Sequence, residues 1–400
     1  MSELSYLEKL LDGVEVKWLP LGHIAAIKTG QSVNKNMISK NPGVYPVINS
    51  GREPLGFINT WNTDNDPIGI TTRGAGVGSV IWQEGKYFRG NLNYSITIDK
   101  KSHINIRYMY HALLHMKNDI HELCTFDGIP ALNAGSLKKL LIPIPCPNIP
   151  EKSLAIQSEI VRILDKFTAL TAELTAELNM RKKQYNYYRD QLLSFKEGEV
   201  EWKALGEIGE VRMCKRILKS QTSSEGEIPF YKIGTFGKEP DSYISRKLFN
   251  EFKEKYSYPK VGEVLISASG TIGRTVIFDG RESYFQDSNI VWIENNEKIV
   301  LNKYLFYFYK IAKWGISEGG TIKRLYNDNL RKLMIPVPFP DSPERSLVEQ
   351  QKIVKLLDKF DALTNSITEG LPREIELRQK QYEYYRDLLF SFPKPDTVSN

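Results

Sequence analysis

The chain of 400 residues has 54 lysines and arginines, 48 aspartates and glutamates, a net charge of +6 and 41% apolar residues. These proportions exclude wholesale disorder, and the length allows two or three domains. Three cysteines without CxxC spacing exclude a disulfide framework and a thiolate zinc site. No apolar run reaches the ~18 residues of a membrane span, and no secretion signal opens the chain. We therefore expect a cytoplasmic protein that does not contact membranes.

The chain is an internal repeat, and its helical parts agree better than its globular parts. RKKQYNYYRDQLLSF at 181–195 recurs as RQKQYEYYRDLLFSF at 378–392, with 11 identities in 15 positions. Two further pairs of segments also match, 160–170 with 353–363 and 140–154 with 333–347. The repeat predicts two globular modules, each followed by a helical segment: module 1–150, helix 151–197, module 198–343 and helix 344–400.

The helical segments carry a heptad seam. From Ile160 to Phe195, eleven positions alternate four and three apart, and nine of them are apolar. About 45 helical residues would form a rod of roughly 65 Å. The seam needs a partner, which is either the other segment, running antiparallel, or a second copy of the chain. The expected seam residues are Ile160, Leu164, Phe167, Leu174, Leu178, Tyr185, Tyr188, Ile353, Leu357, Phe360, Tyr382 and Tyr385.

Three local features modify these helices. A tandem tetrapeptide, TAEL at 171–174 and again at 175–178, adds four residues to a heptad, so each tetrad changes the rod by about 6 Å. Gly370-Leu371-Pro372 predicts a bend or break in the second segment. The prolines at 143–147 and 336–340 are expected to stop any strand or helix from running into the long helices.

The modules carry little that predicts catalysis. The cluster RGAGVG at 73–78 is GxGxG, which lacks the spacing of a dinucleotide fingerprint, and no phosphate-loop motif or Asn/Asp-Pro-Pro-Tyr/Phe tetrapeptide occurs. All five histidines lie in the first module, where residues 111–121 are typical of an amphipathic helix more than of a metal site. We predict no catalytic residue, no metal and no cofactor.

Two pairs of glycine-containing loops occur at matching places, 69–80 with 264–276 and 126–133 with 319–327. Such loops bring backbone amides to phosphates and an arginine to a guanine edge, unless they are ordinary hairpin turns and solvated loops. Both modules have a net charge of +3, which favours a polyanionic partner. The candidate DNA-binding residues are Thr72, Arg73, Gly74, Gly76, Arg89, Asn133, Lys215, Arg216, Lys219, Ser267, Ser269, Gly270, Arg274, Lys323, Arg324 and Asn327.

These features together resemble the DNA-specificity subunit of type I restriction-modification systems. The resemblance rests on LIPIP and MIPVP before the matched helices, on SASGTIGR at 267–274 and on the YNYYRDQLLSF and YEYYRDLLFSF tails. The TAEL tandem resembles the type IC branch. RGAGVGS in the first module departs from SASGTIGR in the second, so the equivalence of Arg73 and Arg274 is in doubt.

The resemblance implies an α+β chain with two mixed α/β target-recognition domains joined by two long helices that pair as an antiparallel coiled coil. It implies that each domain reads one half of a bipartite, asymmetric site in double-stranded DNA. Two methyltransferase subunits would dock on the helices and restriction or translocase subunits would join them, while this chain would have no catalytic activity. A stand-alone nuclease and a coiled-coil scaffold without a role in DNA binding are the two alternatives.

Overall fold

The computed structural model describes residues 10, 13–51, 53–196, 198–315, 324–366 and 368–393. The chain forms two compact units, Met1–Leu174 with Glu374–Asn400, and Thr175–Arg373. Each unit therefore combines one globular module with parts of both helical segments. The division within the first long helix falls between the two TAEL tetrads.

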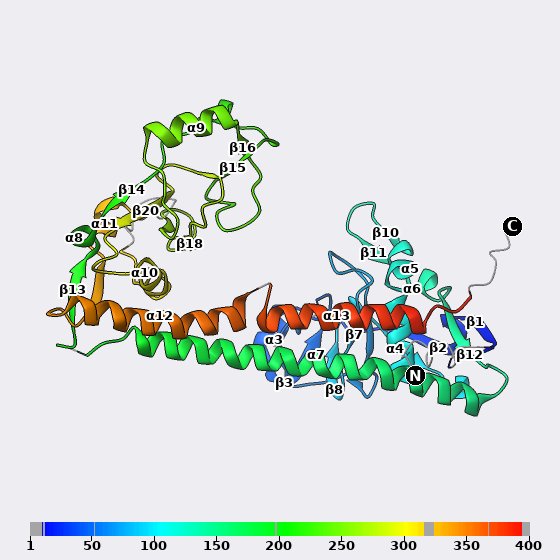
Figure 1. Cartoon of the computed structure of the whole chain (residues 1–400). Helices are drawn as coiled ribbons and strands as arrows, with labels where there is room; N and C mark the ends of the chain where they lie inside the picture. The colour runs from blue at the N-terminus through cyan, green and yellow to red at the C-terminus, as the bar shows by residue number, and fades with distance from the viewer. Residues whose placement is uncertain are drawn as a thin grey trace. The chain divides into compact units, whose positions relative to one another are not determined.

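The first unit contains β1(Val16–Pro20), α2(Leu21–Ile24), β2(Ala25–Thr29), α3(Lys35–Lys40), β3(Pro42–Ile48), β4(Phe57–Ile58), β5(Thr63–Asp64), β6(Ile68–Thr71), β7(Val80–Trp82), β8(Lys86–Arg89), β9(Asn93–Ile98), η1(Lys100–Ser102), α4(Ile106–His115), α5(Lys117–Glu122), β10(Cys124–Thr125), β11(Ala131–Leu132), α6(Ala134–Leu137) and β12(Leu141–Pro145). The long helix α7(Pro150–Leu192) begins in this unit and continues into the second. Helix α13(Gly370–Leu389) contributes most of its length to the first unit (Figure 1).

The second unit contains β13(Val200–Ala204), α8(Leu205–Ile208), β14(Gly209–Arg212), η2(Lys219–Gln221), β15(Ile228–Tyr231), β16(Tyr243–Ile244), α9(Arg246–Lys255), β17(Val264–Ser267), β18(Thr275–Ile277), β19(Tyr284–Phe285), β20(Ile290–Asn295), α10(Asn302–Tyr309), α11(Asn327–Arg331), β21(Met334–Pro338) and α12(Pro343–Asn365). The protein is thus a mixed α/β chain, as the resemblance implied. Within the described part of the chain, no helix is long and apolar enough to cross a membrane.

The two modules share one topology, although their sequences have diverged. A four-stranded antiparallel sheet has the order β2-β9-β6-β7 in the first module and β14-β20-β17-β18 in the second. A parallel pair recurs as β3 with β8 and as β15 with β19. The repeat therefore extends through the globular parts, where sequence likeness is faint.

The proline-rich segments form short strands that end before the long helices begin. β12 pairs antiparallel with β1, and β21 pairs antiparallel with β13. Each is a two-stranded sheet, so the strand has a free edge where a proline that lacks an N–H group is tolerated. Each strand ends at a proline, Pro145 or Pro338, and the long helix begins five residues later, so no strand runs into a long helix, as expected.

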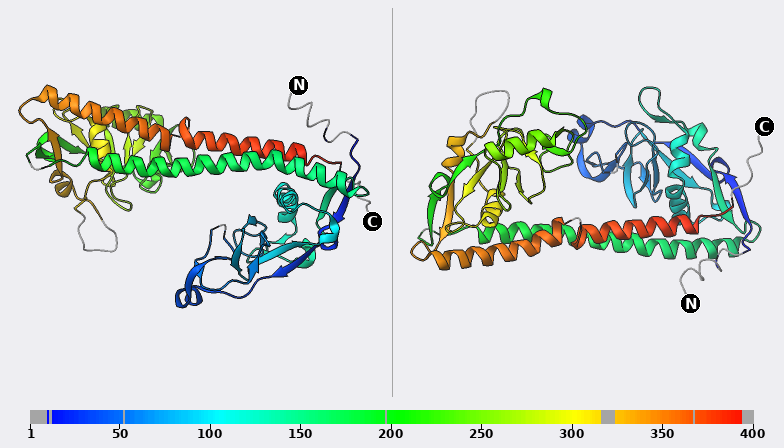
Figure 2. Two further views of the ribbon diagram at one scale, coloured as in Figure 1. Left: turned by 90° about the horizontal axis from the view of Figure 1, so that it is seen from below. Right: turned by 45° about the horizontal axis from the view of Figure 1, so that its top comes forward.

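The long helices of the two halves contact each other inside each unit (Figures 1 and 2). The rings of Phe167 in α7 and Tyr385 in α13 stack at 5.1 Å in the first unit. Those of Tyr188 in α7 and Phe360 in α12 stack at 5.6 Å in the second. The predicted seam positions are buried or half-buried, except that Tyr188 is 44% exposed.

The predicted break in the second helical segment is confirmed. α12 ends at Asn365 and α13 begins at Gly370, where the backbone has a φ of +77°. A Cβ atom at Gly370 would lie 2.5 Å from the carbonyl oxygen of Ala362, so only glycine fits this turn.

Candidate nucleic-acid interface

The two glycine loops that the sequence singled out in each module lie together. In the first module, Arg73 and Ala131 form an isolated antiparallel β-bridge, and the amide of Leu132 donates a hydrogen bond of 2.8 Å to the carbonyl of Thr72. In the second, Ser269 and Arg324 form the same bridge. The amide of Leu325 donates to the carbonyl of Ala268 at 2.8 Å. The loops therefore form one surface feature in each module, built in the same way.

Backbone geometry gives the residue equivalence that the sequence left in doubt. Each first loop has glycines with positive φ near its two ends, Gly74 (+89°) and Gly78 (+77°) in one module, Gly270 (+64°) and Gly273 (+82°) in the other. Gly78 donates to the carbonyl of Thr71 at 2.8 Å and Gly273 to that of Ser267 at 3.0 Å. Arg73 therefore corresponds to Ser269, not to Arg274.

Arg274 occupies the place of Ser79. The amide of Thr71 donates to the carbonyl of Ser79 as that of Ser267 donates to the carbonyl of Arg274. The Arg274 guanidinium donates a hydrogen bond of 2.9 Å to the carbonyl of Phe236 and is half-buried. The module thus holds Arg274 against its own backbone, which limits its reach toward a ligand.

The remaining candidate residues separate by exposure. Arg73, Asn133, Lys215, Arg216, Lys219, Gly270, Arg324 and Asn327 are exposed, and Gly74 and Gly76 are half-buried. The Ser267 hydroxyl accepts from the amide of Arg274, and the buried Ser269 hydroxyl donates to the Asn289 carboxamide at 2.7 Å. Thr72 is buried as well, so these three hydroxyl residues shape the loops from inside. Lys323 lies outside the described residues.

Arg89 does not have the exposure that a DNA contact requires, and we remove it from the candidates. Its side chain is buried and donates to Asn93 at 2.5 Å and to the carbonyl oxygen of Asp66 at 2.7 Å. Burial lowers the pKa of its guanidinium and raises that of the adjacent Tyr87 to about 12. In the parallel strand pairs, Arg89 takes the position of Phe285 in the second module.

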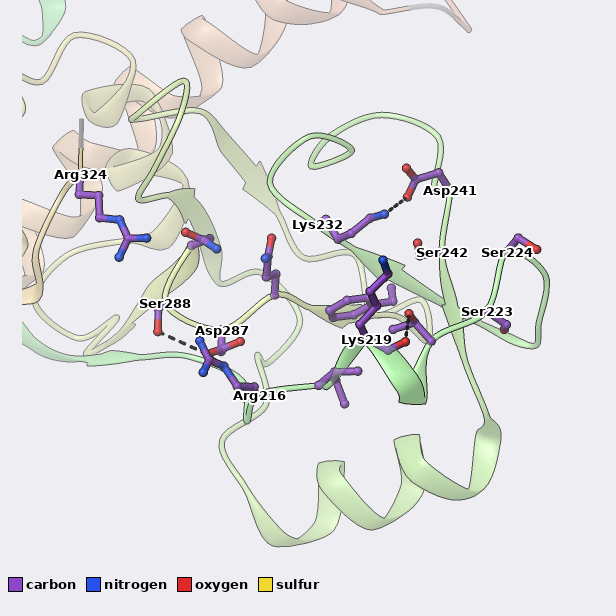
Figure 3. A pocket seen from close by; sticks show the side chains of 15 residues that line it. Arg216, Lys219, Ser223, Ser224, Lys232, Asp241, Ser242, Asp287, Ser288 and Arg324 are labelled. Carbon is purple, nitrogen blue, oxygen red and sulfur yellow. Dashed lines mark hydrogen bonds and ion pairs between the residues drawn. The ribbon is translucent and has the colours of Figure 1, made fainter. Parts of the chain in front are cut away.

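A polar hollow of about 560 Å³ lies next to the bridge in the second module (Figure 3). Three predicted residues line it, namely Arg216, Lys219 and Arg324. Arg216 pairs with Asp287 at 3.1 Å, as Lys232 pairs with Asp241 at 2.9 Å. Among the described residues, neither Lys219 nor Arg324 has an ion-pair partner, which leaves two cations available to an anion.

The sequence reading missed several polar residues of this hollow. Ser223, Ser224, Lys232 and Asn289 line it together with the predicted cations. They come from separate segments of the module, and the internal repeat does not mark them because the equivalent regions of the first module diverge. Only the fold brings them to one place.

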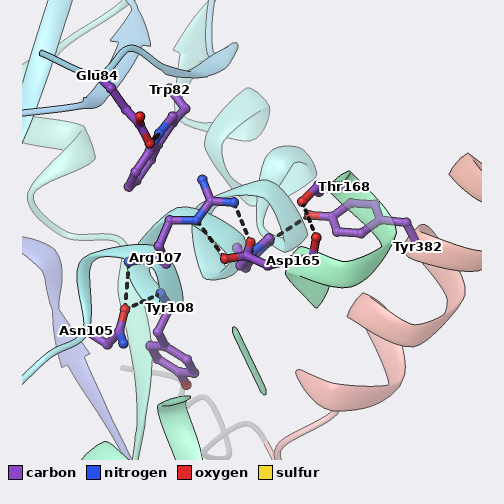
Figure 4. Close-up of polar contacts among 9 residues, drawn as sticks. Trp82, Glu84, Asn105, Arg107, Tyr108, Asp165, Thr168 and Tyr382 are labelled. Atoms are coloured by element: carbon purple, nitrogen blue, oxygen red, sulfur yellow. Dashed lines mark hydrogen bonds and ion pairs between the residues drawn. The ribbon is translucent and has the colours of Figure 1, made fainter. Parts of the chain in front are cut away.

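A polar joint with the buried His111 at its centre attaches the first module to the long helices (Figure 4). Asp165 of α7 accepts hydrogen bonds from Arg107 and, at 2.8 Å, from His111, both on helix α4. The other ring nitrogen of His111 lies 2.9 Å from the Tyr382 hydroxyl of α13. Arg107 also lies over the Trp82 ring, 4.3 Å from its centroid. One module helix therefore contacts both long helices.

The second module repeats this joint with different side chains. Asp358, the repeat counterpart of Asp165, accepts from Tyr307 at 2.6 Å and pairs with Lys303 at 2.7 Å. Lys310 reaches Tyr185 of α7 at 3.4 Å and Asp361 at 3.2 Å. Both joints have an aspartate and a tyrosine on the long helices, Asp165 with Tyr382 in one and Asp358 with Tyr185 in the other. The module side chain that contacts the aspartate differs, being His111 in the first joint and Tyr307 in the second.

The joint shifts the pKa values of its groups. Burial lowers the pKa of His111 to about 4, so the imidazole is neutral at neutral pH. Burial would raise the pKa of Asp165, but hydrogen bonds from Arg107 and His111 lower it below its ordinary value. Within the described residues, no group of three or more His, Cys, Asp or Glu side chains could hold a metal ion.

Comparison with known proteins identifies the family. The family model for the type I restriction modification DNA specificity domain matches residues 13–181 and 197–377. A putative type I restriction enzyme specificity subunit of Haemophilus influenzae is 50% identical, over 97% of this chain and 98% of its own length. The EcoR124I/EcoR124II specificity subunit of Escherichia coli is 43% identical over the whole of both chains.

Solved structures agree at the level of the fold. The S subunit of a type I restriction-modification system from M. genitalium matches with a TM-score of 0.59 and 19% identity, covering 96% of this chain and 98% of that one. With the duplicated fold, the paired loops and relatives of this identity over their full length, the chain belongs to the family of type I restriction-modification specificity subunits.

Proposed function

We propose that this chain is the non-catalytic subunit that selects the DNA sequence in a type I restriction-modification complex. Each module reads one half of a bipartite, asymmetric site in double-stranded DNA. The observation that carries the proposal is the duplicated loop pair. Each module presents an exposed arginine on its β-bridge, Arg73 in one and Arg324 in the other, and neither has an ion-pair partner among the residues that the structure describes. Two copies of one cationic feature suit one polyanion contacted in two places.

The division of labour follows the repeat. Residues 1–150 and 198–343 form the target-recognition domains, and residues 151–197 and 344–400 form the helical spacer. The DNA-facing set consists of the exposed residues and the loop glycines around each bridge: Arg73, Gly74, Gly76, Asn133, Lys215, Arg216, Lys219, Gly270, Arg324 and Asn327, with Lys323 expected beside them. Thr72, Ser267, Ser269 and Arg274 position these loops.

The long helices form an antiparallel coiled coil that separates the modules. Two contacts support this direction, since α7 meets α13 at Phe167–Tyr385 and α12 at Tyr188–Phe360. Residue numbers thus rise along one helix as they fall along the other. Because the polar joint fastens each module to both helices of its unit, a change in spacer length moves the module without altering its own loops.

The spacer also docks two methyltransferase subunits. Tyr187 and Tyr384 occupy the same place in YNYYRD and YEYYRD and are 61% and 57% exposed. Exposed tyrosines are common anchors of protein interfaces, and a duplicated surface suits two copies of one partner. S-adenosylmethionine would be bound by those partners, and restriction or translocase subunits would join the assembly through them.

Insertion of a third TAEL tetrad after Leu178 tests the proposal. The helix α7 is continuous through both existing tetrads, so four more residues lengthen it by about 6 Å, the length of one to two base pairs. We expect a longer unspecified spacer in the methylated site and two unchanged half-sites. The measurement is a map of methylated sites in cells that carry each variant.

The matched control inserts the same tetrad after Gly85, which lies in an exposed turn between β7 and β8. Among the described residues, a Cβ atom added at Gly85 would meet no heavy atom within 4 Å. This variant should leave the spacer unchanged. A changed half-site with an unchanged spacer in the Leu178 variant would refute the role of the helices as a ruler.

Two simple assays separate the alternatives. A stand-alone nuclease would cut DNA when the purified chain is mixed with Mg²⁺, whereas a specificity subunit leaves the DNA intact. A scaffold without a DNA role would show no binding that weakens as salt increases, which a gel shift at two ionic strengths detects.

A further inference from the structure

The arginines of the two β-bridges stand on opposite strands. In the first module the arginine is on the first loop, as Arg73, and faces Ala131 on the second. In the second module the first loop supplies Ser269, and the arginine is on the second loop, as Arg324. Each module therefore has one guanidinium at its bridge, supplied by either strand. Sequence alignment would score this as two unrelated substitutions.

The bridge geometry makes the two arrangements equivalent in space. Residues directly opposite each other on antiparallel strands point to the same face, with Cβ atoms about 5 Å apart. A long, flexible arginine side chain can reach across that distance. The guanidinium of Arg73 and that of Arg324 can thus serve the same region of their modules although their backbones lie on different strands.

The surroundings show that both arginines are available. Both side chains are exposed, and in the described part of the chain neither has an ion-pair partner. The other cations near the second bridge differ, because Arg216 pairs with Asp287 and Lys232 with Asp241. Arg73 directly precedes Gly74, and Ser269, which faces Arg324, directly precedes Gly270. Both glycines have a positive φ, so the first loop turns at the same point beside each bridge.

We propose that Arg73 and Arg324 make equivalent DNA contacts, one for each half-site, and that the position of the guanidinium on the bridge matters more than the strand that carries it. This inference rests on the proposed function. It assigns to Arg73 and Arg324 the equivalence that the sequence left in doubt for Arg73 and Arg274.

Moving the charge across the bridge tests the inference. In the intact chain, bound to its methyltransferase partners, Arg73→Ala should weaken binding to a duplex of the mapped site about 10-fold, which corresponds to about 1.4 kcal/mol. Arg73→Ala combined with Ala131→Arg restores the arginine from the opposite strand. We expect that variant to recover most of the lost affinity, and Lys100→Ala, at an exposed cation away from the loops, to bind as the wild type does.

The second module provides an independent arm. Arg324→Ala should weaken binding by a similar factor, and duplexes with one half-site scrambled should show that each arginine acts on a different half. A change of base preference identifies a base contact, and a uniform loss with a smaller salt dependence identifies a phosphate contact. Either pattern supports the inference.

Three results separate failure of the inference from failure of the proposed function. If Arg73→Ala binds as tightly as Lys100→Ala, the bridge arginine is not a DNA contact. If the relocated variant has the melting temperature of the wild type but binds as weakly as Arg73→Ala, the strand matters and the equivalence is wrong. If the wild-type complex shows no site-specific binding, the proposed function itself fails.

Discussion

Arg89 illustrates how one side chain can change its role between two copies of a fold. The guanidinium fills space that an apolar side chain fills in the second module, where Phe285 takes the same strand position. Gly69 makes room for it, since a Cβ atom there would lie 3.0 Å from a guanidinium nitrogen, and the matching strand position holds Leu265. The pair of Arg89 and Gly69 in the first module thus takes the strand positions of Phe285 and Leu265 in the second.

This arrangement predicts a stability effect without a DNA effect. Arg89→Ala should lower the free energy of unfolding by about 3 kcal/mol, because buried acceptors on Asn93 and Asp66 lose their donor. Urea denaturation measures this loss. The salt dependence of DNA binding by the folded fraction should not change. Arg73→Ala is the matched comparison, and we expect it to leave stability unchanged and to reduce the salt dependence of DNA binding. If instead Arg89→Ala reduces the salt dependence without lowering stability, Arg89 is a DNA contact.

At the scale of elements, the polar joint between helix α4 and the long helices makes the stability of the first unit depend on pH. His111 is buried and its pKa is lowered to about 4, whereas an exposed histidine titrates near 6.5. Between these values the unfolded chain binds a proton that the folded unit does not. The free energy of unfolding therefore falls as the pH drops from about 6.5 to 4, by up to about 3 kcal/mol.

His111→Gln should flatten this part of the stability curve, although the substitution also lowers stability at pH 7. The measurement is urea denaturation of the full chain at several pH values between 7 and 4. His121→Gln, at an exposed histidine, is the control and should leave the slope unchanged. The second joint has Tyr307 in place of His111, so it contributes no histidine to this pH range. If the free energy of unfolding of the His111→Gln variant falls with pH as steeply as that of the wild type, another group causes the pH dependence.

At the scale of the whole molecule, the duplicated tyrosines predict the stoichiometry of the assembly. Tyr187→Ala should remove one of two methyltransferase subunits and Tyr384→Ala the other, because each variant deletes one of two equal anchors. Native mass spectrometry of the co-purified complex counts the subunits. Met180→Ala, at another exposed apolar residue of α7, should retain both; loss of both copies from either single tyrosine variant would contradict two separate docking surfaces.

The sequence alone determined the duplication, the long helices and the break at Gly370, because heptad periodicity and glycine-proline signals are local and survive divergence. It also singled out both loops of each module. It misplaced Arg89, whose surroundings depend on strand pairing, and it did not predict that the proline segments form paired strands.

Only the tertiary structure decided how the loops meet and which strand of each bridge carries the arginine. The bridges Arg73–Ala131 and Ser269–Arg324 join segments more than 50 residues apart, and a charge that changes strand leaves no mark in a linear alignment. The joints at Asp165 and Asp358 likewise combine side chains from distant segments. Local patterns predict elements, whereas the pairing of strands brings together the residues that we propose to contact DNA.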